Sequence, residues 1–570
     1  MLAKKRFHDK GTHSECRLKR PPRRRFRGNQ HVGAEGVSPR STSEQKLRKS
    51  KFPLPKAEPK FKYVIMEFFS TFEKLSNIVK CKACDGDVSF APTKIRGLGF
   101  KLEVRCARCE PTEIDSGPFI RNGFEINSRI TFAMRLLGVG YSGLRLFCGL
   151  MDFFEFINVN AYHRLSKRIA HVAGKVADEI MNESAREEQR LTQQARVFQD
   201  ARFVSVSVDG SWAKRGFTSL FGLVAVIGDK SNKVIDVCVK SLYCNACAQL
   251  ESRRDEDSYV LREEHESECD LNHQGSSKSM EASSALELFQ RSVESRALIY
   301  KNFIGDGDSN AHAAVVNSCP YGDNIRVVKK ECVGHVSKRM GTRLRRVYKE
   351  NPSLRRRGSF NLKEIGKLTK FYGHAIRSNP ESVSKMKDSI WATFYHRIST
   401  DELPQHHLCP SGSTSWCAWQ RAKAEHEEDE YMHPAGWSVE LQEALKPIYT
   451  QLSSDELLER CLGSHTQNNN ESLHSTVWRL CPKTRFFGRR SVETAVNIAI
   501  CTFNEGRKSL SVLMRELQCT VGEGCRNELR ARDEQRVWEA NERSARRRSQ
   551  SRGSSSGAEA SSLDELTDVD

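Results

Sequence analysis

The sequence of 570 residues lacks any run of about eighteen consecutive apolar residues, the length that a transmembrane helix needs. It also lacks a charged opening followed by an apolar stretch, the pattern of a secretory signal peptide. We therefore expect a soluble protein without a membrane partner, in a compartment that keeps thiols reduced. Nineteen cysteines in such a protein indicate metal sites, above all where they stand in CxxC pairs.

A calcium-binding loop is absent as well, although the segment "NFIGDGDSN" resembles one. Asp306, Asp308 and Asn310 take the first, third and fifth places of an EF-hand loop. The sixth place, where the turn needs glycine, is Ala311, and the twelfth, where a bidentate glutamate closes the site, is Asn317. The two aspartates therefore need another explanation.

Acidic and large apolar residues are scarce in residues 1–60. This segment holds 18 Lys and Arg against 5 Asp and Glu, so it carries most of the net charge of +19. It cannot bury enough apolar surface to fold, and we expect a disordered basic tail. The tail is either a nuclear-localisation or phosphate-binding arm or a solubilising leader. Residues 511–570 are expected to be helical at first and then disordered, because the chain becomes Ser-rich from about residue 540.

Two CxxC pairs, "CKAC" and "CARC", follow the tail. Four thiolates in two such knuckles bind zinc tetrahedrally and leave no open position, so we expect a structural zinc in a zinc-ribbon-like module over 61–117. The expected ligands are Cys81, Cys84, Cys106 and Cys109. Residues 118–200 then place apolar residues at helical spacing and form either a DNA-binding or a packing region, with packing favoured.

Segments with the alternation typical of β-strands begin at Phe203. The expected elements are strands at 203–212, 217–228 and 233–243, a helix at 283–295, a strand at 297–306, a helix at 309–318 and a strand at 325–332. In an RNase H-like sheet this order sets the first strand beside the fourth, so that Asp209 and Asp306 meet. Glu471 would join them from the first turn of a helix that an Asn-rich turn can cap.

Three carboxylates that converge from two central strands and one helix can hold two Mg²⁺ or Mn²⁺ ions. Two such ions activate a water or a 3′-hydroxyl and stabilise the leaving oxygen of a phosphodiester. Each acid alone also has an ordinary structural role, because Asp forms turns at strand ends and Glu complements the dipole at a helix start. Their placement in one strand order favours the catalytic interpretation.

Seven motifs in fixed order extend this interpretation: "VSVDGSW", "YCNAC", "NHQGSSKSME", "YKNFIGDGDSN", "KKECVGHVSKRMGTRLR", "HHLCPSGSTSWC" and "NNNESLHSTVWRLCPK". Over about residues 61–510 the chain resembles the Mutator-like transposase domain of animal transposon-derived proteins. The resemblance implies a DDE transposase that acts on the terminal inverted repeats of a DNA transposon. Its implied catalytic triad is Asp209, Asp306 and Glu471. The RNase H-like core would span 201–510, with insertions at 244–280 and 333–465.

Further cysteines and histidines indicate metal or support roles. Cys244 and Cys247, with His265 and Cys269, predict a zinc-stapled insertion, and His273 is the alternative histidine. Three further groups are open: Asp308 as a helix cap or outer support, Cys332 and His335 as the CxxH of the resembled family, and a third metal cluster of His407, Cys409 and Cys417. His335 lies either near the metal or DNA or in a structural contact. The third cluster has no clear fourth ligand; Cys461 is one candidate, and plain packing is equally compatible.

Residues 326–357 contain twelve Lys and Arg against two Glu. Five of the basic residues would lie on a helix after the last strand and face DNA phosphates, namely Lys338, Arg339, Arg343, Arg345 and Arg346. The usual alternative is a solvated charged face. Base-specific recognition is expected in the zinc-ribbon-like and helical regions.

The expected fold is α/β: an RNase H-like mixed sheet with helical and zinc-stapled insertions, preceded by the zinc-ribbon-like module and the disordered basic tail. The expected function is a nuclear DDE transposase that uses Mg²⁺ to cut transposon ends in double-stranded DNA and joins the freed 3′-hydroxyl to target DNA, as a homo-oligomer. Two alternatives remain: a domesticated, non-catalytic DNA- or chromatin-binding protein, and a structure-selective nuclease.

Overall fold

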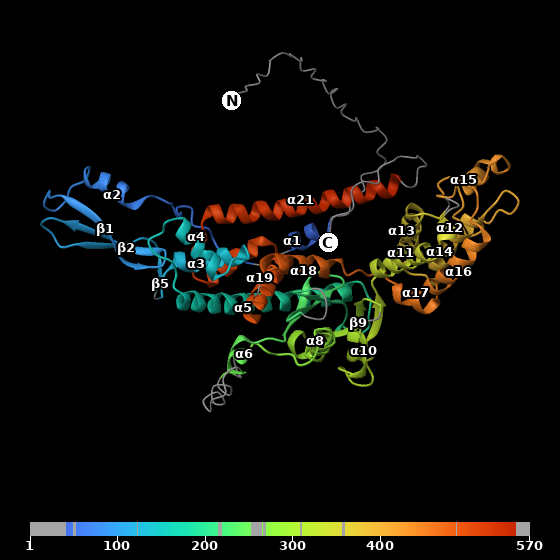
Figure 1. The fold of residues 1–570 in the computed structure, drawn as a ribbon, viewed down its shortest axis with the longest axis horizontal. Helices are drawn as coiled ribbons and strands as arrows, with labels where there is room; N and C mark the ends of the chain where they lie inside the picture. The colour runs from blue at the N-terminus through green and yellow to red at the C-terminus, as the bar shows by residue number, and fades with distance from the viewer. Residues whose placement is uncertain are drawn as a thin grey trace, which may run out of the picture. The chain divides into compact units, whose positions relative to one another are not determined.

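The computed structural model describes residues 41–49, 53–121, 123–214, 219–251, 265, 269–307, 310–355, 360–485 and 487–553. The chain divides into Met1–Arg40 and Ser41–Asp570, and the described residues all belong to the second unit (Figure 1). Most of the expected basic tail, and the chain after residue 553, therefore lie outside the described residues. None of the described helices combines the length and apolar character that a membrane span requires.

A small antiparallel sheet forms the first part of this unit. It contains β1 (Val88–Arg96), β2 (Gly99–Cys106) and β3 (Thr112–Asp115) in the order β1-β2-β3, and α2 (Phe68–Ser76) precedes it. Among the described residues of these three strands, only Val88 buries its side chain. The expected zinc-ligand cysteines flank this sheet.

Three helices follow a short hairpin of β4 (Phe119–Ile120) and β5 (Gly123–Phe124), as the helical spacing predicts. They are α3 (Glu125–Leu136), α4 (Tyr141–Leu150) and α5 (Val159–Gln194). One face of α5 is apolar at four-residue intervals, and Val172, Val176 and Ile180 on it are buried against α19 (Arg489–Glu505). This burial supports packing as the role of α5.

The main sheet has five strands in the order β10-β9-β6-β7-β8. Its strands are β6 (Phe203–Trp212), β7 (Phe221–Gly228), β8 (Val234–Ser241), β9 (Ile299–Gly305) and β10 (Val328–Glu331). The first three form the expected antiparallel meander, β9 runs parallel to β6, and β10 runs parallel to β9. The first strand thus lies beside the fourth, as the sequence predicts.

Both faces of the main sheet are covered, so every residue of β7 is buried. Because side chains alternate along a strand, Leu223 and Ile227 pack with α5 and α19, whereas Val224 and Val226 pack on the opposite face. That opposite face is covered by α8 (Ser279–Gln290) and α10 (Asn310–Asn317). The short helices α6 (Asn245–Glu251) and α9 (Ser292–Arg296) lie in the connections.

A helical insertion separates β10 from the helix that carries Glu471. Its helices are α11 (Val333–Glu350), α12 (Pro352–Arg355), α13 (Leu362–Ser378), α14 (Val383–Ile398), α15 (Ala418–Glu425), η1 (Glu428–Glu430), α16 (Val439–Leu452) and α17 (Asp455–Cys461). The insertion has its own hydrophobic core. Its ends meet, because the backbone N–H of Val333 donates to the carbonyl of His465 (3.0 Å).

The remaining helices are α18 (Asn468–Leu480), η2 (Arg507–Ser509), α20 (Leu510–Glu516), α21 (Glu523–Gly553) and α1 (Thr42–Lys49). The sequence assigns α1 to the disordered tail, yet it packs against α21 and α19. Its Lys46 is buried, with Nζ 3.4 Å from the ring centroid of Phe503. This cation–π contact and the buried side-chain methylenes explain how a basic segment can dock.

Candidate functional site

Asp209 lies near the end of β6, paired with Ala225 of β7. The side chain is mostly buried. Burial, followed by the carboxylates of Glu281 and Glu471, raises the pKa of Asp209 to about 7, although His335 opposes this shift. Asp209 is therefore surrounded by like charge that no nearby cation fully compensates.

Asp306 follows the last residue of β9, the neighbour of β6. Its Oδ1 accepts the backbone N–H of Gly307 (2.6 Å) and lies 3.4 Å from Nη2 of Arg339. Burial alone would raise the pKa of Asp306, but this N–H and the charges of His335 and Arg339 lower it. A Cβ atom at residue 307 would collide with the Arg339 guanidinium, so a side chain there would displace Arg339 from Asp306.

Glu471 lies in the first turn of α18, which is fastened to the sheet beside Asp209. The Gln467 side chain donates to the carbonyl of Val208 (2.9 Å). Asn470 accepts from the Ser207 hydroxyl (2.7 Å) and donates to the carbonyl of Ala225 (3.0 Å). The Asn-rich turn therefore anchors the helix to the sheet. The expected capping role is wrong, because the N-cap residue is Gln467 and it makes no side-chain cap bond.

His335, in the first turn of α11, lies between two of these acids. Its Nδ1 is 3.7 Å from Oδ1 of Asp306, and its Nε2 is 3.9 Å from Oε1 of Glu471. The neighbouring Cys332 side chain raises the pKa of His335 against the effect of burial, and Asp306 adds to the rise. Cys332 is buried at the helix N-cap, and its Sγ accepts the N–H of Gln467 (3.4 Å).

The structure thus brings Asp209, Asp306 and Glu471 to one place around His335, at the ends of β6 and β9. Of the two interpretations of the CxxH pair, the position of His335 supports the one next to the acids. Asp308 lies outside the described residues.

Two further residues beside these acids are not predicted from the sequence. Glu281, in the first turn of α8, lies close to Gly210, the residue after Asp209. A Cβ atom at Gly210 would be 3.3 Å from Cγ of Glu281. Burial and then Asp306 raise the pKa of Glu281. His474 is buried with Nδ1 3.6 Å from Oδ2 of Asp209, and burial lowers the pKa of His474 to about 4. Its spacing of three residues from Glu471 on one helix is the signal that could have found it.

The basic helix α11 divides its charges between two tasks. Arg339 turns inward, where Nη2 lies 3.0 Å from Oε2 of the buried Glu331 as well as near Asp306. Arg343 is half-buried and donates to Gln451 (2.7 Å), and the exposed Arg346 pairs with Glu350 (2.8 Å). Lys338 and Arg345 are exposed on the surface of α11. Of the five expected DNA-binding residues, Arg339 is therefore part of the acidic site.

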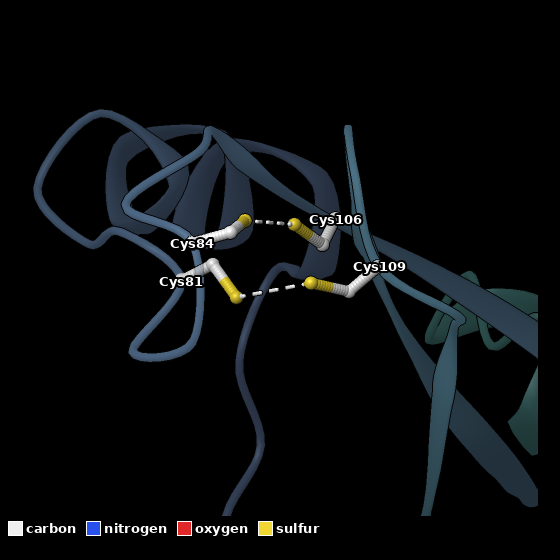
Figure 2. A group of neighbouring side chains, drawn as sticks. All are labelled: Cys81, Cys84, Cys106 and Cys109. Atoms are coloured by element: carbon white, nitrogen blue, oxygen red, sulfur yellow. Dashed lines mark hydrogen bonds between the residues drawn. The ribbon is translucent and has the colours of Figure 1, made fainter.

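The first cysteine group is assembled as the CxxC spacing predicts. Figure 2 shows Cys84 facing Cys106, with Sγ atoms 3.3 Å apart, and Cys81 facing Cys109 at 3.9 Å. All four sulfur atoms lie within 4.8 Å of one another, a set that could hold zinc. One pair precedes β1 and the other lies at the end of β2, so a bound metal would join the two strands.

The second group, in the insertion after β8, contains Cys244, Cys247, His265 and Cys269. The Sγ of Cys244 lies 3.0 Å from Nε2 of His265, and the Sγ atoms of Cys247 and Cys269 are 3.4 Å apart. His273 is elsewhere, with Nε2 3.0 Å from the Ser279 hydroxyl. The structure thus places His265, not His273, with the three cysteines.

The third group corrects the expectation of His407 with Cys409 and Cys417. The structure joins these cysteines to His396 and His406, with all four ligand atoms within 4.8 Å of one another. His407 is exposed and its ring contacts Tyr395. Cys461 belongs to the hydrophobic core of the helical insertion. Sequence spacing does not show which of the adjacent His406 and His407 is the ligand. The other histidine of the group, His396, lies in the last turn of α14.

The comparisons with known proteins identify the family. The family model described as Mutator-like transposase matches residues 60–417. No match was found among curated proteins or among solved structures. The matched segment includes Asp209 and Asp306 but ends before Glu471. The structure alone places Glu471 beside the two aspartates. Because the match covers more than half of the sequence, this chain belongs to the Mutator-like transposase family, whose members are enzymes that act on nucleic acid.

Proposed function

We propose that this chain is a DDE-type DNA transposase that binds the terminal inverted repeats of a transposon, cuts their ends and joins the freed 3′-hydroxyl to target DNA. The observation that carries the proposal is the gathering of Asp209, Asp306 and Glu471, from two adjacent strands and a helix, around His335. The strand order of the main sheet supports an RNase H-like core.

The donor set fits a hard divalent cation. Carboxylate oxygens are the ligands that Mg²⁺ and Mn²⁺ prefer, and the raised pKa of Asp209 reflects burial among the charges of Glu281 and Glu471. Asp209, Asp306 and Glu471 would hold Mg²⁺, with Glu281 next to them. When bound, such ions polarise the phosphodiester and lower the pKa of the attacking hydroxyl.

The residues of the chain itself fix the geometry of this reaction. Asp209 is held by the hydrogen-bonded centre of the sheet, and the anchors of Gln467 and Asn470 hold Glu471 against the same strand. Arg339 ties Asp306 to Glu331. Catalysis depends on such positioning within fractions of an ångström.

The three cysteine- and histidine-containing groups are proposed to hold structural zinc, because their thiol and imidazole donors are the usual zinc ligands. The exposed Lys338 and Arg345 on α11 would contact DNA phosphates beside the site. A nuclear location and a homo-oligomer that pairs two transposon ends complete the proposal.

The test is a cleavage and strand-transfer assay with the full chain and Mg²⁺, on DNA ends that the chain selects by binding. The variants Asp209→Asn, Asp306→Asn and Glu471→Gln keep side-chain size but remove charge. Loss of a metal ligand removes several kcal/mol of transition-state stabilisation, so each should slow cleavage by about a thousandfold or more. Glu281→Gln should give a smaller loss.

Asp200→Asn is the matched control, because Asp200 lies just before β6, pairs with Arg202 and is outside the acidic site. It should cut and join DNA at the wild-type rate. A wild-type protein that bound DNA but neither cut nor joined it would establish the non-catalytic DNA- or chromatin-binding alternative. Cutting without joining would indicate a nuclease.

A further inference from the structure

A cavity of about 450 Å³ lies beside the helix that carries Glu471, between α18, α19, η2, α21 and α1. Its walls are rich in guanidinium groups and contain a single carboxylate among the described residues. The charged residues of the wall are Arg479, Arg507, Arg532, Arg536, Arg543 and Glu539. We call this site the arginine cavity.

The five arginines of the wall outnumber the three carboxylates in or beside it, those of Glu528, Asp533 and Glu539. Arg532 pairs with Glu528 (2.6 Å), and Arg536 donates to the uncharged carbonyl of Thr502 (2.8 Å). The side chains of Arg479, Arg507 and Arg543 have no ion pair to any described residue.

The carboxylate of Asp533, which is buried beside the cavity, offsets part of this positive charge. Its oxygens accept the backbone N–H groups of Arg507 (2.7 Å) and Lys508 (3.1 Å). Burial lowers the pKa of Arg507, and the charges of Arg479 and Arg532 lower it further, while the charge of Asp533 opposes them without reversing the shift. The cavity therefore gathers like charges that an anion would stabilise.

The arginine cavity continues the surface of the acidic site along one helix. Ser475 and Arg479 follow Glu471 at four-residue intervals, so they lie on the same side of α18. At 1.5 Å per residue, Arg479 is about 12 Å along the helix axis from Glu471. That distance corresponds to roughly three or four nucleotides of one DNA strand at 3.4 Å each.

We propose that the arginine cavity holds backbone phosphates of the DNA strand that flanks the bond cut at Asp209, Asp306 and Glu471. Guanidinium groups bind phosphate oxygens by paired, charge-assisted hydrogen bonds, and the hydroxyl of Ser475 adds a donor. The inference rests on the proposed function, and it assigns a DNA-binding surface apart from helix α11. Such contacts set the register of the strand without reading its sequence.

The test compares DNA affinity over 50 to 200 mM salt for the full chain and two double variants. Arg479→Gln/Arg543→Gln removes two exposed charges of the cavity. The matched control, Arg526→Gln/Arg530→Gln, removes two exposed charges of α21 that pair with Glu523 and Glu534. Each lost phosphate contact changes the slope of log K against log salt by about 0.9, so the cavity variant should lower the slope by about 2 and the affinity about tenfold or more.

The control variant should keep the wild-type slope, and both variants should keep the wild-type Tm. Equal slopes for the cavity variant and the wild type would overturn the inference. A second arm uses inorganic phosphate. If phosphate raised the Tm of the wild type alone while DNA affinity stayed equal in all proteins, the cavity would be a small-anion site, and the DNA inference would be wrong.

Failure of the proposed function has a different signature. Asp209→Asn should lose cleavage while it keeps the full salt slope, because its side chain contacts no phosphate in this cavity. A wild type that binds DNA without cutting it would remove the transposase proposal, and its salt slope would still decide whether the cavity holds DNA.

Discussion

The β1–β3 sheet and the five-stranded sheet are both built from short alternating strands, but they are stabilised differently. In the small sheet only Val88 buries its side chain among the described residues, and β3 is exposed along its whole length. In the large sheet every residue of β7 is buried between two layers of helices. The small sheet has cysteines at its strand ends, whereas the large sheet has carboxylates near the ends of its strands.

The difference shows how the two sheets can use their polar residues. A sheet with little core is stabilised by cross-links, and its cysteines could supply one by binding a metal. A sheet with two covered faces is stable through apolar burial, and it can place charged groups at its strand ends for chemistry. Three experiments test this contrast.

Metal removal should have the largest effect. Structural zinc supplies on the order of 10 kcal/mol in small zinc domains, so a chelator should unfold the β1–β3 sheet and leave β6–β9 folded. Hydrogen exchange, measured on peptides of the treated protein, should become fast in residues 88–115. Exchange in the strands of the large sheet should stay slow. Metal analysis should give three zinc ions per chain, and two for Cys84→Ser.

Cys319→Ser is the control, because Cys319 is exposed and outside the three groups. It should keep all three ions. Continued protection of the β1–β3 amides after complete zinc loss would show that the sheet is stable without a cross-link and would remove the contrast.

A buried ion pair should give the next largest effect. Lys233 lies between Glu505 (2.8 Å) and Glu187 (3.0 Å) next to β8, whereas the more exposed Lys101 on β2 lies near Glu113 (3.1 Å). Lys233→Met leaves two carboxylates without their buried cation and should lower the free energy of unfolding by about 3 to 5 kcal/mol in urea titrations. Lys101→Met should leave the urea midpoint unchanged.

The pH dependence has a defined sign. Burial alone would lower the pKa of Lys233, but Glu505 and Glu187 outweigh it and raise that pKa. The stabilisation is therefore fully present below the ordinary lysine pKa and is lost as the pH rises through the folded-state pKa. Equal effects of the two lysine variants would contradict the contrast.

Matched leucine truncations should give the smallest difference. Leu223→Ala on β7 opens a cavity in the core and should cost about 3 kcal/mol of unfolding free energy. Leu102→Ala on β2 removes a half-buried side chain and should cost about 1 kcal/mol. Urea unfolding measures the first, and hydrogen exchange of β2 measures the second. A larger cost for Leu102→Ala would reveal a core in the small sheet.

Much of the main sheet could be predicted, because alternation along a strand is a local signal. The same holds for the CxxC pairs, since two ligands two residues apart need no long-range information. Glu281 gave no such signal: a glutamate in the first turn of a helix usually complements the dipole, and only the packing of α8 on β6 brings it to Asp209.

The remaining errors share one physical cause, which is dependence on distant contacts. His396 and His406 are fixed by the fold of the loop between α14 and α15. Helix α1 has the composition of a tail, yet it packs against α21 and α19, where Lys46 contacts the ring of Phe503 on α19. The arginine cavity joins residues 43 and 543 in one wall, a separation that no sequence window contains.

The hydrogen bond between Val333 and His465 has a consequence for the entropy of loop closure. The chain leaves the site after β10, forms the helical insertion and returns to the same point. For a closed loop the entropic cost rises by only about 0.6 kcal/mol for each doubling of length. The free-energy cost of keeping Asp306 and Glu471 together should therefore depend only weakly on how many residues the insertion contains. The insertion could change in length while the two carboxylates still meet.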